Sequence, residues 1–144
     1  GDINNVLISL LHLQNIYFFK LNVVTPKKIF NLNKKKLKNY YNKNLQLMTD
    51  PILGSKGSQF IMTDVWLSMG ETDKNKIKYF KGFTVSKKIM EASSKKALFM
   101  HCLPAKRGQE VDSEVLDSKN SIVLEQAKNR MYIQQAILIY VLKK

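Results

Sequence analysis

The sequence predicts an α/β fold, in which a parallel sheet carries helices on both faces. The main observation is that short apolar runs of strand type alternate along the chain with segments of helical character. A second is the length of 144 residues with 44% hydrophobic side chains, which suits one compact domain spanning residues 1–144 and leaves little room for another.

Seven segments are predicted to be helical. Residues 4–19 have apolar side chains at helical spacing, and Asp2 or Asn4 can cap the start of this helix. The pair Asp50-Pro51 opens a short helix, because proline is tolerated in a first turn. The other helices are expected at residues 32–44, 76–80, 86–92, 112–116 and 125–142.

Five apolar runs are predicted to be strands, at residues 21–24, 45–48, 59–63, 97–100 and 121–124. Ligands of parallel sheets bind beyond the carboxyl ends of the strands. Three loops follow strand-like runs, at residues 64–71, 101–109 and 125–130, and residues 1–5 open the first helix. We therefore expect these four segments to converge on one edge of the sheet.

The net charge of +13 raises the question of a nucleic-acid partner. The lysines are spread along the chain, however, and only Arg107 and Arg130 among the 24 basic residues are arginine. A lysine-rich solvated surface is therefore favoured over nucleic-acid binding. No apolar run approaches the roughly 20 residues of a membrane span, so no membrane partner is expected either.

The single cysteine, Cys102, excludes an internal disulfide and argues against a cysteine-based metal site. Neither a metal nor a cofactor is predicted. A reducing compartment is the ordinary expectation for such a chain, with the cytoplasm favoured and an organelle matrix as the alternative.

Two motifs carry the groups that could bind an amino acid. Gly1 to Asn5 precede a helix, where free N–H groups favour an anion and an asparagine amide can donate to a carboxylate; the alternative is that Asn4 and Asn5 only cap the helix. In the run Thr63 to Gly70, Asp64 can accept from an ammonium group and Ser68 can join the same network. Trp66 is interpreted as a core residue.

Two further motifs carry groups suited to a carbonyl. His101-Cys102-Leu103-Pro104-Ala105 follows a buried-type strand, and its rigid proline can fix the directions of backbone carbonyls. The alternatives are a buried apolar cysteine and a buried imidazole whose hydrogen bonds are satisfied. Arg130, after Asn129, can polarise a carbonyl or bind phosphate, or can simply lie on the surface.

The blocks GDINN, TDVWLSMGE, FMHCLPAKRGQEV and the late NR resemble ornithine carbamoyltransferases, in the order and at close to the spacing of that family. The resemblance covers essentially the whole chain and matches the ornithine-binding domain. It implies a three-layer, Rossmann-like sheet that lacks its first strand, because the family has a strand ending at the GD motif. It also implies L-ornithine and carbamoyl phosphate as ligands and a homotrimer as the assembly.

The resemblance also implies roles for individual residues. Asp64 and Ser68 would contact the α-amino group of ornithine, with Asn5 and the Met69 backbone near its α-carboxylate. Cys102 and Leu103 would contact the carbamoyl group, and Arg130 would polarise its oxygen. The neutral δ-amine would attack the carbamoyl carbon and phosphate would leave, giving citrulline.

Some features depart from the family pattern. The phosphate-binding domain that precedes this one in the family has no counterpart in the sequence. Ile8 and Lys106 stand where the family usually has histidine, and Lys128 stands where it has an acid. These departures suggest a fragment that is inactive alone, or a decayed, non-catalytic amino-acid-binding or interaction module.

Overall fold

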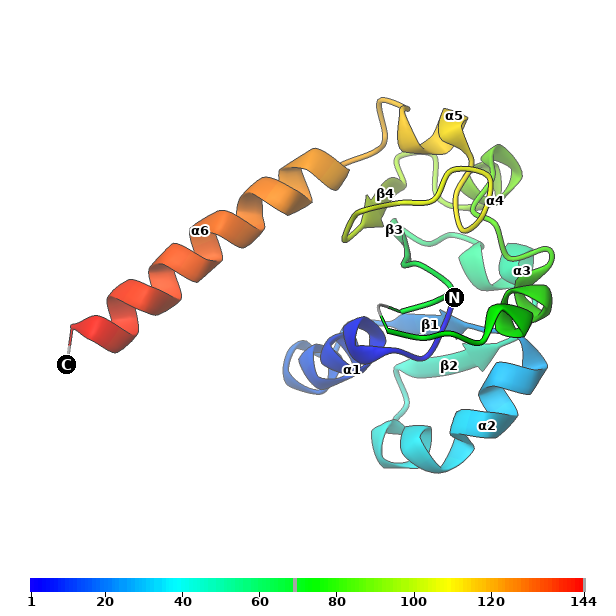
Figure 1. Cartoon of the computed structure of the whole chain (residues 1–144), viewed down its shortest axis with the longest axis horizontal. Helices are drawn as coiled ribbons and strands as arrows, with labels where there is room; N and C mark the ends of the chain where they lie inside the picture. Colours follow the sequence, from blue (N-terminus) through cyan, green and yellow to red (C-terminus); the bar gives the residue numbers. More distant parts are fainter. Residues whose placement is uncertain (69, 144) are drawn as a thin grey trace.

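The computed structural model describes residues 1–68 and 70–143. It contains two parallel strand pairs, surrounded by helices (Figure 1). The strands are β1 (Leu21–Val24), β2 (Leu45–Met48), β3 (Phe60–Thr63) and β4 (Leu98–His101). The helices are α1 (Asn5–Tyr17), α2 (Lys27–Leu37), η1 (Lys38–Tyr40), α3 (Pro51–Ser55), η2 (Lys74–Phe80), α4 (Lys87–Ala92), α5 (Ser113–Leu116) and α6 (Val123–Leu142).

The strands confirm the predicted α/β class. β1 pairs in parallel with β2, and β3 pairs in parallel with β4, with Thr63 opposite His101 at the carboxyl ends. The two pairs form separate sheets, whereas the alternation predicted one continuous sheet. The segment before α1 lies between them, because the Gly1 nitrogen donates to the Val24 carbonyl and a Cβ on Gly1 would lie 3.7 Å from Thr63 Oγ1. The expectation that the sheet lacks the family's first strand stays a prediction.

The predicted fifth strand at residues 121–124 is wrong. Ser121 forms one isolated parallel bridge with Phe99, and α6 begins two residues later at Val123. The following residues Leu124 to Ala127 are good helix formers, so the helix extends back over the second half of the expected strand. Residues 125–130 were expected both as a loop after this run and as the start of the helix at residues 125–142, and they lie within α6.

The second helix begins earlier than predicted. We expected residues 32–44, but α2 starts at Lys27, directly after Pro26. The Thr25-Pro26 pair therefore both ends β1 and starts the helix, since the fixed φ of proline suits a helix start. Ile29 is buried on α2, which explains why the helix includes this turn.

Two apolar clusters form the core. One surrounds β1 and includes Leu11 of α1, Ile29 of α2, and the stacked rings of Trp66 and Phe80, whose centroids are 5.3 Å apart. This confirms the core interpretation of Trp66. The other surrounds Phe99 of β4 and comprises Val85, Ile89, Phe99, Val111, Val115 and Val123.

The helix α6 projects away from the rest of the chain (Figure 1). Its first turn packs against β4, where Val123 is buried. Farther along, its large apolar side chains are exposed, among them Ile133, Ile137 and Tyr140. Neither α6 nor any other helix in the described part of the chain has the length and apolarity needed to cross a bilayer.

Candidate functional site

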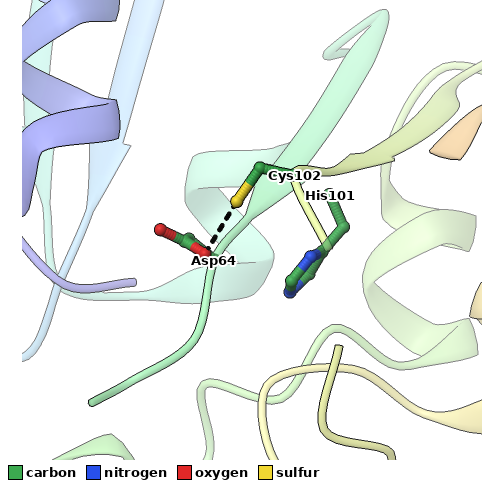
Figure 2. Close-up of side chains that lie close together, drawn as sticks. All are labelled: Asp64, His101 and Cys102. Carbon is green, nitrogen blue, oxygen red and sulfur yellow. Dashed lines mark hydrogen bonds between the residues drawn. The ribbon is translucent and has the colours of Figure 1, made fainter. Parts of the chain in front are cut away.

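Asp64 is the point where three separate segments of the chain meet. It follows β3, and its Oδ2 accepts a hydrogen bond of 2.6 Å from the side-chain amide of Asn4, the residue before α1. Its Oδ1 accepts from the Sγ of Cys102, which follows β4, at 3.0 Å (Figure 2). The same oxygen accepts from the backbone N–H of Val65. The predicted convergence of these segments at one edge is therefore found for Asp64, Cys102 and the first helix.

The environment of Cys102 keeps its thiol protonated. Burial is the largest cause that raises the pKa of Cys102, to about 12, and the hydrogen bond and negative charge of Asp64 add to it. The charge of Arg130 acts in the opposite direction but is a smaller effect. Since the thiolate is the nucleophilic form of cysteine, Cys102 is suited to donating a hydrogen bond rather than to forming a covalent intermediate.

His101 is a buried imidazole with both ring nitrogens in use. Its Nδ1 accepts from the Leu103 backbone N–H at 2.8 Å, so its Nε2 carries the proton and donates to Glu110 Oε1 at 3.2 Å. The side chain is 1% exposed, which confirms the interpretation of a satisfied buried imidazole.

The cluster of Asp64, His101 and Cys102 is poorly suited to binding a metal ion. Potential ligand atoms of Asp64, His101 and Cys102 lie within 4.8 Å of one another. Both nitrogens of His101 are occupied, however, and the raised pKa of Cys102 opposes the thiolate form that binds metals. The cluster is therefore suited to hydrogen bonding rather than to metal binding.

Arg130 lies in the second turn of α6 and lines a groove of about 910 Å³ together with Cys102, Leu103 and Asn129. Its side chain is exposed. The start of α6 is tied to β4 because the Oε1 of Gln126 accepts a 3.1 Å hydrogen bond from the backbone N–H of His101. Gln126 and Arg130 are four residues apart and so share a face of the helix. Arg130 therefore faces the Cys102 loop from α6, in agreement with the helix predicted at residues 125–142.

The remaining residues predicted to bind the ligand are less closely associated with Asp64. Asn5 is exposed at the start of α1. Ser68 is half-buried, and its backbone exchanges hydrogen bonds with Glu71: its N–H donates to the carboxylate at 3.2 Å and its carbonyl accepts from the Glu71 N–H at 3.0 Å. Met69 lies outside the described residues. Roles for Asn5, Ser68 and Met69 in binding ornithine stay predictions.

Three residues at this edge were not among the predicted site residues. For Asn4 the sequence left two interpretations, an amide that donates to a carboxylate and a helix cap. It is a cap, since its Oδ1 accepts from the N–H groups of Val6 and Leu7. Capping uses the oxygen and leaves the amide free to donate, so the sequence did contain a signal for its bond to Asp64. Glu110 and Gln126 gave no comparable signal.

A family model described as "Aspartate/ornithine carbamoyltransferase, Asp/Orn binding domain" matches residues 1–141. The chain belongs to this family. The chain is 39% identical over 146 residues to an ornithine carbamoyltransferase of Nitrobacter winogradskyi, covering 99% of this chain and 47% of the relative. It is 41% identical over 155 residues to the Methanococcus vannielii enzyme, covering 99% of this chain and 50% of the relative.

Solved structures agree with this assignment. This chain superimposes on the ornithine carbamoyltransferase of Burkholderia thailandensis with a TM-score of 0.84 and 34% identity, covering 97% of this chain and 44% of that one. For the anabolic ornithine carbamoyltransferase of Campylobacter jejuni the TM-score is 0.83 and the identity is 34%. This match covers 100% of this chain and 50% of that one. The fold is thus Rossmann-like, and the chain spans about half the length of the relatives it matches.

Proposed function

We propose that this chain is the ornithine-binding part of an ornithine carbamoyltransferase. Such an enzyme transfers the carbamoyl group of carbamoyl phosphate to the δ-amine of L-ornithine, giving L-citrulline and phosphate. The names of the relatives support the reaction. The observation that carries the proposal is the junction of Asn4, Asp64 and Cys102, which places a carboxylate and a thiol donor at one edge.

In this proposal, Asp64 accepts from the α-ammonium group of ornithine and Ser68 joins that contact. Asn5 and the backbone of Met69 lie near the α-carboxylate, where the dipole of α1 is favourable to an anion. Because Asp64 is already bonded to Asn4 and Cys102, the ligand ammonium would compete with or add to these neutral donors. A charged donor forms the stronger hydrogen bond with a carboxylate.

The carbamoyl end of the reaction is assigned to the groove beside α6. Leu103 and the Cys102 thiol contact the carbamoyl group, and Arg130 stabilises the charge that develops on its oxygen. The lone pair of the δ-amine forms the new C–N bond, the bond from carbon to the phosphate oxygen breaks, and the amine loses a proton. Catalysis would depend mainly on positioning and on electrostatic stabilisation.

Carbamoyl phosphate binding and a homotrimer are proposed for the whole enzyme, because the chain covers only about half of its relatives. A cytoplasmic location stays a prediction.

Calorimetric titration of the purified chain with L-ornithine tests the proposal. Ornithine should bind, and putrescine, which lacks the α-carboxylate, should bind at least about tenfold more weakly, a difference of about 1.4 kcal/mol. Asp64→Asn should weaken ornithine binding, while Glu91→Gln, which removes an exposed acid on α4, should not. Absence of ornithine binding, with the fold intact, would instead support a non-catalytic interaction module.

A further inference from the structure

Glu110 is a carboxylate buried at 0% exposure beside the second apolar cluster. Its Oε1 accepts two hydrogen bonds, from the Lys106 backbone N–H at 2.6 Å and from His101 Nε2 at 3.2 Å. Its Oε2 has no partner within the described ranges 1–68 and 70–143. Burying a carboxylate is unfavourable unless its hydrogen bonds compensate, so a buried acid with one unsatisfied oxygen calls for an explanation.

The hydrogen bonds of Glu110 extend through His101 to the backbone of the next residues. Because His101 Nδ1 accepts from the Leu103 N–H, the ring can present only one tautomer to Glu110, with the proton on Nε2. Glu110 is itself fixed by its backbone, since its carbonyl accepts from the Val85 N–H at 2.9 Å. The acid therefore orients the imidazole, and the imidazole orients Leu103.

The loop between these two points has an unusual backbone. Leu103 has a φ of +56°, in the left-handed region that a leucine rarely adopts. Its N–H is bound by the His101 ring, and the N–H of Lys106 is bound by Glu110. The residues from Cys102 to Ala105 are thus restrained at both ends by the same buried pair.

We propose that Glu110 is a positioning residue, which acts through His101 and the Lys106 N–H to fix the loop from Cys102 to Ala105. This loop aims the Cys102 thiol at Asp64 and places Leu103 in the groove beside Arg130. The inference rests on the proposed function only in assigning the carbamoyl group as the ligand of this loop. The hydrogen bonds that restrain the loop do not depend on any ligand.

Alkylation of the single cysteine tests the restraint without any substrate. In Glu110→Ala the loop is released and the thiol can leave Asp64, so iodoacetamide should modify Cys102 at least about tenfold faster at pH 8. The alkylation rate of Glu110→Gln should stay within about threefold of the rate for the chain without substitutions. The amide oxygen of glutamine can accept from both N–H groups. Glu114→Ala, which removes an exposed acid on α5, should leave the rate unchanged. Trp66 fluorescence checks that each variant is folded.

If Glu110→Ala does not fold, a measurement on the chain without substitutions still tests the proposal. Nitrogen-15 NMR should show His101 with the proton on Nε2, with His12 as the internal comparison, and the amides of Leu103 and Lys106 should be protected from hydrogen exchange. Fast exchange of both amides, or a folded Glu110→Ala chain with unchanged alkylation, would overturn the inference. If ornithine fails to bind the unmodified chain, the proposed function fails, while these readouts still decide the role of Glu110.

Discussion

The Sγ of Cys102 lies 3.0 Å from the Oδ1 of Asp64, so the residues that follow two neighbouring parallel strands share one hydrogen bond (Figure 2). The other carboxylate oxygen is bound by Asn4 from the start of α1. One acid thereby joins β3, β4 and the first helix, and its removal should alter the chemistry of the thiol in a measurable way.

Asp64→Asn should lower the pKa of Cys102 below its value of about 12, because the variant removes a negative charge that disfavours the thiolate. Burial is the larger cause and remains, so the pKa should still lie above that of a free thiol. Each unit of decrease raises the thiolate population about tenfold at pH values below the pKa. The pH dependence of the alkylation rate measures this shift, with Glu91→Gln as the control; identical profiles for the variant and the unmodified chain would contradict it.

Substitutions of Asn4 should separate its two roles. Asn4→Ala should lower the free energy of unfolding by about 0.5–2 kcal/mol, because α1 loses the side chain that accepts from Val6 and Leu7. Asn4→Ser retains a capping oxygen but not the amide that reaches Asp64, so it should be destabilised less than Asn4→Ala, by the loss of the hydrogen bond to Asp64 alone. Both variants should bind ornithine about tenfold more weakly. Urea unfolding and calorimetry check these outcomes, and undiminished ornithine affinity of Asn4→Ser would argue against a role for the contact with Asp64.

Acid should destabilise the chain partly through Glu110. Burial tends to raise the pKa of Glu110, but the hydrogen bonds from His101 and from the Lys106 N–H outweigh it, so the pKa lies below its ordinary value of 4.5. A carboxyl group with a lowered folded-state pKa contributes stability above the unfolded value, and this contribution is lost as the pH falls through the folded value. Glu110→Gln cannot titrate, so its free energy of unfolding should fall less steeply below about pH 4.5. Urea titrations of both proteins over this range measure the difference, and parallel curves would refute it.

Gly54 should be intolerant of even a methyl group. A Cβ at this position would lie 2.3 Å from Cγ2 of Val24, where α3 packs against β1. The β-branched valine has few rotamers with which to move aside, so Gly54→Ala should cost about 1–3 kcal/mol of stability. Adding Val24→Ala removes the clashing atom, and the double variant should be more stable than the sum of the single changes predicts. If the changes in the free energy of urea unfolding are strictly additive, Gly54→Ala does not clash with Val24 and the prediction is wrong.

The strands could be predicted well because their boundaries are local. Residues 21–24 and 45–48 match β1 and β2 in full, since each run is followed closely by a proline-containing pair that marks its end. The fifth strand failed because a short apolar run is compatible with either element, and the helix formers after Leu124 determined the outcome. The division into two sheets depends on contacts between distant segments, which no local pattern reveals.

The residues of the candidate site could likewise be predicted only in part. Asp64 and Cys102 could be identified because each follows a strand, and parallel strands bring their carboxyl ends to one edge. Glu110 could not, because a glutamate in a loop is normally solvated, and only the tertiary fold buries it beneath His101.

The bare surface of α6 also has a consequence for how the chain behaves in solution. Large apolar side chains such as Ile133 and Tyr140 face water there, while a net charge of +13 makes separate molecules repel one another. Added salt shortens the range of that repulsion and leaves the apolar contact intact. Concentrated solutions of the chain should therefore stay clear at low ionic strength and turn turbid as sodium chloride is added, the reverse of proteins that salt dissolves.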